Sequence, residues 1–283
     1  MDKSSSTIFR KHIALPSDHG SWVFLISPLL IGLFAGESWT VASLCLIIGT
    51  LAAFLLRQPL SIVIKIHNGR RSRRDLPTAW FWVFVYGMFS VLAIIGLILL
   101  GFTYILILAI PGILVFCWHL FLINKRAERR QAGVEIVASG VLALTAPAAY
   151  WIGYGSYNPT GWLLWFLIWA QSAASIVYAY LRLEQRQITS VPNKRTCIRM
   201  GHRSLLYSTF NIVTVIILSF IRITPPFLPI AYAVQWTETL WGVFNPAIGF
   251  KPTSIGLRQL AVSTIYTIPV SYTHLTLPTI LLV

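Results

Sequence analysis

The chain has little charge of either sign and very little negative charge. Of its 283 residues, 11% are charged and 56% are hydrophobic, and the mean hydropathy is +0.73. A soluble protein of this length needs far more charged surface, so the composition argues against an ordinary soluble domain. The apolar residues form continuous runs and do not alternate with polar ones. This pattern argues against half-buried β-strands and predicts membrane-spanning α-helices.

The sequence also lacks the residues that metal and covalent chemistry would need. The three cysteines are scattered, so neither a disulfide framework nor a zinc site is expected. Phosphate-binding loops and the signatures of zinc proteases and serine hydrolases are absent. The carboxylates of the expected cytoplasmic connections are isolated from one another: Asp75, Glu128 and Glu184. A two-metal site is therefore poorly supported, no cofactor is expected, and whether the protein is an enzyme stays open.

Positive charge predominates, with 22 Lys and Arg against 8 Asp and Glu and a formal net charge of +14. Nucleic-acid binding is one explanation of such an excess, but the distribution of the charges gives a simpler one. Almost all of them lie in the connections between apolar runs. Cytoplasmic loops of membrane proteins carry Lys and Arg in this way and attract anionic head groups. We therefore expect membrane lipids as partners and no nucleic acid.

Nine apolar runs predict an all-α bundle of about nine transmembrane helices, in a single domain over residues 1–269. The predicted spans are 21–36, 39–56, 78–100, 102–123, 134–152, 161–181, 205–221, 227–244 and one that begins after residue 258. Long basic connections are expected after the second span, which ends at 57–59, and over residues 182–203. With the N-terminus in the cytoplasm, every Lys and Arg except Arg222 falls in a cytoplasmic segment. The positive-inside rule thus predicts a multi-pass protein of the inner or plasma membrane, with its N-terminus inside and its C-terminus outside.

The last residues differ in character from the rest. Residues 270–279 read VSYTHLTLPT, which is similar to the translation of a transposon-based sequencing-library adapter. We therefore expect residues 270–283 to be an artefact of sequencing and assign no meaning to His274.

Ionisable side chains within or next to the spans supply the candidate site residues. A charge at membrane depth costs about 2.5–3.5 kcal/mol on insertion scales and usually faces a bundle interior or a watery cavity. The candidates for acid–base chemistry are His19, Glu135 and Glu238. The candidates for ligand binding are Arg57, Asn124 and Arg182.

Glu238 is the most informative of these residues. It follows Gln235 by three positions, so both side chains share one helix face about two turns from the inner end of the eighth span. A structural ion pair or amide contact between helices is the alternative to a functional role. Glu135 has the alternative of stabilising a helix N-terminus through the macrodipole, and His19 that of a cap-associated or interfacial histidine.

Three local patterns point to a known family. They are L-P-x-x-H-G-x-W at residues 15–22, R-x-P-L at residues 57–60 and E-R-R-x-A-G-x-E at residues 128–135. Together they resemble the YwiC-like family, a group of uncharacterised bacterial integral membrane proteins, and the likeness extends over residues 15–268. The resemblance implies a location in a bacterial membrane and no known activity.

A further resemblance, at the level of the fold, is to the UbiA superfamily of intramembrane prenyltransferases. It implies nine helices with the N-terminus inside, and active-site loops between spans two and three and between spans six and seven. Both of these connections are long and basic in this sequence. The family's N-D-x-x-D and D-x-x-x-D motifs are missing from them, so Arg and Lys would have to hold a phosphorylated lipid head without metal.

Three classes of function follow from these observations. The first is a protein that handles a phosphorylated or isoprenoid lipid in a cytoplasm-facing cavity, with Arg57 and Arg182 holding the head group. The second is a secondary transporter that uses Glu238 and Glu135 in a proton or solute path. The third is a non-catalytic membrane scaffold whose charges only set the topology. We favour the first over the second.

Overall fold

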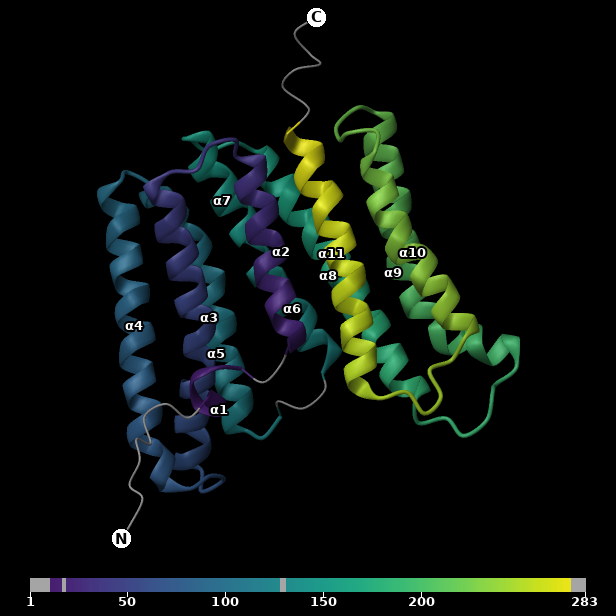
Figure 1. Ribbon diagram of the computed structural model, residues 1–283, viewed down its shortest axis with the longest axis horizontal. Coiled ribbons are helices and arrows are strands. Elements are labelled where there is room, and N and C mark those ends of the chain that lie inside the picture. Colours follow the sequence, from purple (N-terminus) through teal and green to yellow (C-terminus); the bar gives the residue numbers. More distant parts are fainter. Residues whose placement is uncertain (1–10, 17–18, 128–130, 276–283) are drawn as a thin grey trace, which may run out of the picture. The chain divides into compact units, whose positions relative to one another are not determined.

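Membrane-length helices dominate the structure. The computed structural model describes residues 11–16, 19–127 and 131–275, and every regular element within these ranges is a helix (Figure 1). Six helical segments are long and apolar enough to cross a membrane: Val41–His67, Arg73–Leu99, Thr103–Asn124, Ala132–Tyr154, Thr160–Gln185 and Lys194–Phe220. The apolar helix Ser21–Ala35 is shorter. The helices thus indicate an all-α, multi-pass membrane protein, while the predicted number of nine spans and their orientation stay predictions.

The chain forms two compact units, and each is described by itself. Unit 1 comprises Met1–His19 and Trp39–Gln131, and unit 2 comprises Gly20–Ser38 and Ala132–Val283. The predicted boundary at residues 269 and 270 falls inside the last helix of unit 2 and stays a prediction, as does the single domain.

Unit 1 is built around a long helical pair. Its elements are α1 (Lys11–Ala14), α3 (Val41–His67), η2 (Arg73–Asp75), α4 (Leu76–Leu99), η3 (Thr103–Leu108) and α5 (Ala109–Asn124). Helices α3 and α4 pack along each other, and α5 also packs against α3. The turn after α4 is tight and uncharged, and Gly101 adopts a φ of +86°, which glycine tolerates without steric cost.

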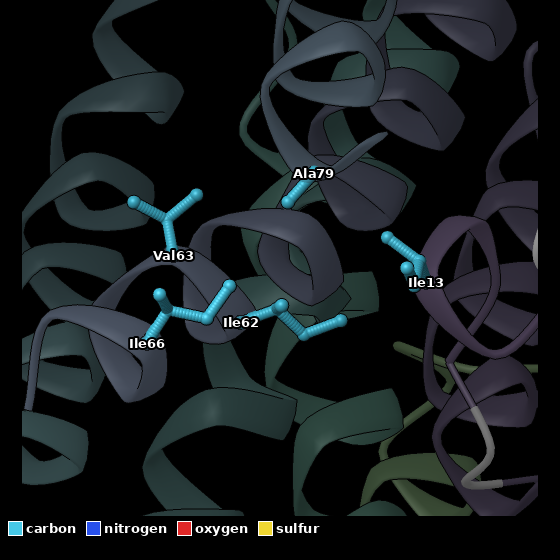
Figure 2. Close-up of a cluster of buried hydrophobic side chains, with 5 residues drawn as sticks. All are labelled: Ile13, Ile62, Val63, Ile66 and Ala79. Carbon is cyan, nitrogen blue, oxygen red and sulfur yellow. The ribbon is translucent and has the colours of Figure 1, made fainter. Parts of the chain in front are cut away.

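A buried apolar cluster lies where α1 meets α3 and α4 (Figure 2). It consists of Ile13, Ile62, Val63, Ile66 and Ala79. The cluster explains why α3 continues to His67, whereas the sequence predicted that the span would end at residues 57–59. That prediction is wrong because a proline inside a helix costs about 3 kcal/mol, while each of the three buried α3 side chains contributes roughly 1.5–3 kcal/mol. Packing therefore outweighs the effect of Pro59.

Unit 2 is organised around α8. Its elements are α2 (His19–Ala35), α6 (Ala132–Ala143), α7 (Thr145–Tyr154), α8 (Thr160–Gln185), α9 (Lys194–Phe220), α10 (Leu228–Phe244) and α11 (Pro252–Leu275). Helix α8 packs against α6, α7, α9, α10 and α11. Helix α2 approaches α7 closely at Gly32, where a Cβ would collide with the backbone of Ala146.

Two helix boundaries in unit 2 differ from the sequence predictions. The predicted fifth span is two helices, α6 and α7, because Pro147 has no N–H to donate to the carbonyl of Ala143. Helix α9 begins at Lys194, eleven residues before the predicted start. The side chain of Asn193 accepts a hydrogen bond from the backbone N–H of Thr196 at 2.9 Å and so caps the helix. Much of the expected basic connection is therefore the first turns of α9.

Candidate functional site

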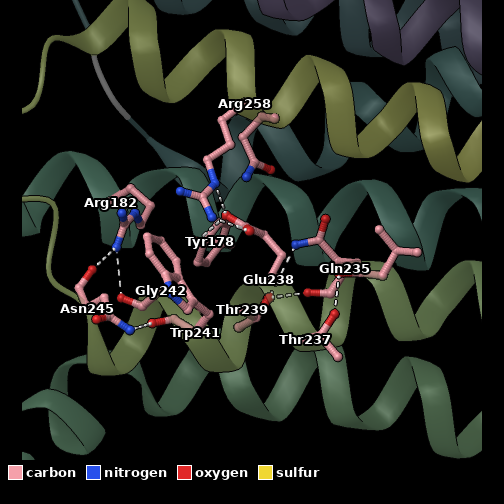
Figure 3. Close-up of polar contacts among 12 residues, drawn as sticks. Tyr178, Arg182, Gln235, Thr237, Glu238, Thr239, Trp241, Gly242, Asn245 and Arg258 are labelled. Carbon is pink, nitrogen blue, oxygen red and sulfur yellow. Dashed lines mark hydrogen bonds and ion pairs between the residues drawn. The ribbon is translucent and has the colours of Figure 1, made fainter.

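Five side chains from three helices of unit 2 form a polar group that we call the Glu238 cluster. It consists of Tyr178 and Arg182 of α8, Glu238 and Trp241 of α10, and Arg258 of α11 (Figure 3). The α8 pair is spaced i, i+4 and the α10 pair i, i+3, so each pair shares a face of its helix. The cluster borders a cavity of about 50 Å³.

Glu238 and Arg258 form an ion pair between α10 and α11. Arg258 approaches the carboxylate with Nε 2.7 Å from Oε1 and Nη2 2.7 Å from Oε2, an arrangement in which both carboxylate oxygens are engaged. Tyr178 donates a third hydrogen bond to Oε1 at 2.8 Å. The Glu238 side chain is 11% exposed and that of Arg258 is 40% exposed, so the carboxylate is the more deeply buried partner. The Arg258 guanidinium also lies 4.0 Å from the centre of the Trp241 ring, within cation–π range.

Arg182 is buried and bonds to neutral acceptors. Its Nη1 atom lies 2.9 Å from Gln185 Oε1, 2.8 Å from the carbonyl oxygen of Gly242 and 2.6 Å from that of Asn245. The last two oxygens belong to the C-terminal end of α10, where helix carbonyls lack intrahelical partners and favour a cation. Within the described part of the chain, none of its hydrogen-bond acceptors is a carboxylate. With two guanidinium groups and one carboxylate, the cluster carries a net positive charge.

Close approach of α8 and α10 makes this arrangement possible. A Cβ at Gly242 would collide with the Tyr178 ring, so only glycine permits the observed distance between the helices. The side chain of Gln185 strengthens the same contact: Nε2 donates to the carbonyl of Gly242 at 3.1 Å, and Oε1 accepts from the backbone N–H of Ala247 at 3.3 Å.

A second, smaller cavity lies between α2, α8 and α11. Its volume is about 20 Å³, and we call it the Gln171 cavity. Its polar lining consists of Ser27, Gln171, Ser172, Ser175, Ser263 and Tyr266. Ser175 donates a 2.8 Å hydrogen bond to Gln259, which also lines the cavity at the Glu238 cluster, so the two cavities share a hydrogen-bonded border. The Oε1 atom of Gln171 is buried and has no hydrogen-bond partner among the described residues.

Comparison with known proteins finds a family match in the first part of the chain. Residues 15–150 match the YwiC-like protein family. The predicted family resemblance is confirmed over these residues. Neither a curated protein nor a solved structure matches the chain. The resemblance to UbiA prenyltransferases stays a prediction.

The YwiC-like segment and the Glu238 cluster occupy different parts of the chain. The segment ends at residue 150, inside α7, whereas every member of the cluster lies on α8, α10 or α11. The family match therefore supports the class of membrane protein. The chemistry of the cluster has to be inferred from the geometry of the cluster itself.

The structure brings two of the six predicted site residues together. Glu238 accepts a hydrogen bond from Tyr178, and the Arg182 guanidinium lies 5.9 Å from the centre of the same tyrosine ring. Glu135 lies in the first turn of α6, as predicted, where it is exposed and accepts a 2.7 Å hydrogen bond from Tyr180. The side chain of His19, at the start of α2, lies outside the described residues.

The other two predicted residues belong to unit 1. Arg57 lies on α3 with its guanidinium 5.6 Å from the centre of the Phe54 ring. Asn124 ends α5 and accepts a 2.9 Å hydrogen bond from Asn68 at the end of α3. Their role in ligand binding stays a prediction, and neither belongs to the Glu238 cluster.

Sequence reasoning missed Tyr178 and Arg258. The spacing of Tyr178 four residues before Arg182 is a signal that could have identified it, because such residues are neighbours on a helix. Arg258 was assigned to the connection before the ninth span. Pro252, which suits the first turn of a helix, is the signal that α11 begins earlier and includes this arginine.

Proposed function

We propose that this membrane protein binds the phosphorylated head group of a lipid, an isoprenoid lipid included, in a cytoplasm-facing cavity at the Glu238 cluster. One observation carries the proposal: Arg182 is a buried cation whose hydrogen-bond acceptors are neutral, next to a carboxylate that Arg258 already neutralises. A buried positive charge is costly without a negative partner. An anionic ligand in the cavity would supply that partner.

The lining of the cavity suits a charged head on an apolar chain. Guanidinium groups bind phosphate through paired hydrogen bonds, so Arg182 and Arg258 could hold the head group without a metal. Phe250 and Ile255 line the same cavity and offer apolar contacts to the first carbons of the chain. The proposal assigns a binding function and no reaction.

The topology that we propose is nine spans with the N-terminus inside. Helices α2, α10 and α11 would complete the six candidate spans. The cavity lies at the end of unit 2 where α8 and α10 finish and α9 and α11 begin. The same end carries Arg186, Lys194, Arg195, Arg199, Arg203 and Lys251. This concentration of positive charge favours a cytoplasmic location for the cavity and for bound anionic lipid, in a bacterial inner membrane.

Native mass spectrometry of the protein, extracted in a mild detergent, tests lipid binding directly. We expect one defined phospholipid or isoprenyl phosphate per protein, and its loss in Arg182→Gln and in Arg258→Gln. Arg186→Gln removes the same charge outside the cluster and should retain the lipid. Because both substitutions remove contacts inside unit 2, the circular dichroism spectrum of each variant should be compared with that of the wild type, which separates loss of the lipid from loss of the fold. Unchanged lipid retention in both variants would contradict the proposal.

A secondary transporter is the second candidate, and the Gln171 cavity favours it. A polar cavity that borders the Glu238 cluster through Ser175 and Gln259 is the kind of interior path that transporters use. Uptake of anions into proteoliposomes should then fall in Glu238→Gln and persist in Glu184→Gln, which changes an exposed carboxylate on α8. If neither lipid binding nor uptake is found, the scaffold function remains.

A further inference from the structure

We propose that binding of an anionic group at the Glu238 cluster is coupled to the uptake of one proton by Glu238. The inference rests on the proposed function, because it requires that an anion enters the cavity. It adds that the site is a proton-linked site, in which the carboxylate is charged when the cavity is empty and neutral when the anion is bound.

In the empty cavity the Glu238 carboxylate is paired with a cation. Arg258 Nη2 donates to Oε2 at 2.7 Å, Arg258 Nε lies 2.7 Å from Oε1, and Tyr178 donates to Oε1 at 2.8 Å. The titratable and charged groups that face Glu238 are Tyr178 and Arg182 from α8 and Arg258 from α11. Within the described residues, α9 forms no ion pair with Glu238.

An incoming anion changes this balance. Both Glu238 and Arg258 line the cavity, which has a volume of only about 50 Å³, so an anion held by Arg182 and Arg258 must lie next to the carboxylate. The anion competes for Arg258, the ion-pair partner of Glu238, and adds a like charge beside it. Like charges that share a partly buried site disfavour double ionisation.

Protonation of Glu238 relieves the repulsion and adds a contact. A proton from solvent enters on the side of the partly exposed Arg258 and forms an O–H bond on the carboxyl group, and no other covalent bond changes. The neutral acid can then donate a hydrogen bond to the anion, while Arg258 remains free to pair with the ligand. Both guanidinium charges of the cluster are then available to the anion.

Proton linkage has a defined sign. Because the bound state holds one proton more than the empty state, lowering the pH favours the bound state. Affinity should increase as pH falls, with a limit of about tenfold for each pH unit for a single proton. The reverse dependence, with tighter binding at high pH, is incompatible with the proposal.

We choose two probes whose own charge stays constant near neutral pH, so that protonation of the probe does not contribute to the pH dependence of binding. Inorganic sulfate represents a free anion, and short-chain phosphatidylglycerol, a phosphodiester, represents a lipid head group. Isothermal titration calorimetry on the full chain in detergent would give the dissociation constant between about pH 5 and about pH 8, a range over which one coupled proton produces a readily measured change. Glu238→Gln is the test variant, and Glu184→Gln is the matched control.

We expect the wild type and Glu184→Gln to bind more weakly as the pH rises, and Glu238→Gln to bind with constant affinity. Titrations of the wild type in two buffers of different ionisation enthalpy should show the uptake of about one proton, without reliance on any variant. A pH-independent wild type, or a pH dependence that persists in Glu238→Gln, overturns the coupling while leaving anion binding intact. Absence of binding of both probes at every pH instead overturns the proposed function. Binding of sulfate alone would assign the site to free anions. Binding of the short-chain lipid would assign it to lipid head groups.

Discussion

The ion pair between Glu238 and Arg258 should contribute measurably to the stability of unit 2. We consider the substitution Arg258→Gln, which removes the cation and keeps a polar side chain of similar length. Glu238 would then remain 11% exposed with its hydrogen bond from Tyr178 but without a cationic partner. The contact of the guanidinium with Trp241 would be lost as well.

The expected magnitude lies between the values for surface and buried pairs. Removing one partner of a fully buried pair costs about 3–5 kcal/mol, whereas exposed pairs contribute about 0–1 kcal/mol. Because Arg258 is 40% exposed, water screens part of the interaction, and we expect a loss of about 1–3 kcal/mol in the free energy of unfolding.

A double-mutant cycle isolates the interaction from other effects of each substitution. Unfolding in detergent would be followed by circular dichroism for the wild type, Arg258→Gln, Glu238→Gln and the double variant. The coupling energy should exceed the roughly 0–1 kcal/mol that exposed pairs contribute. A coupling energy within that range would refute the reasoning that burial of the carboxylate makes this pair strong.

Three further predictions concern packing and hydrogen bonding in unit 2. Gly242→Ala places a Cβ against the Tyr178 ring and should cost about 1–3 kcal/mol of unfolding free energy, whereas Gly256→Ala, which meets no atom within 4 Å, should not destabilise the protein. Equal effects of the two substitutions in thermal melts would disprove the close approach of α8 and α10. Gln171→Met removes a buried oxygen that lacks a partner and should leave the melting temperature unchanged or raised. A marked decrease would show that this oxygen is bonded in the membrane. Asn193→Ala removes the α9 cap and should lower stability by about 1 kcal/mol, with loss of helical signal, and an unaltered melt would argue against the cap.

The sequence alone determined the class of the protein and the place of most helices. Predicted spans 78–100, 161–181 and 227–244 correspond to α4, α8 and α10 to within two residues at most boundaries. The boundaries are predictable because each apolar run must match the thickness of a bilayer, a local requirement that does not depend on neighbouring helices. The predictions were wrong where local signals compete with packing, as at Pro59, or where a cap such as Asn193 extends a helix into basic residues.

The same division applies to the candidate site. The sequence by itself singled out Glu238 and Arg182, because charge in an apolar segment is costly and therefore informative wherever it occurs. Only the tertiary structure decided which groups they meet. Tyr178 and Glu238 are 60 positions apart in the chain, and Gly242 lets their helices approach closely enough for a hydrogen bond. The local sequence shows where a charge lies in an apolar segment, but the partner of that charge depends on how helices distant in the sequence pack together.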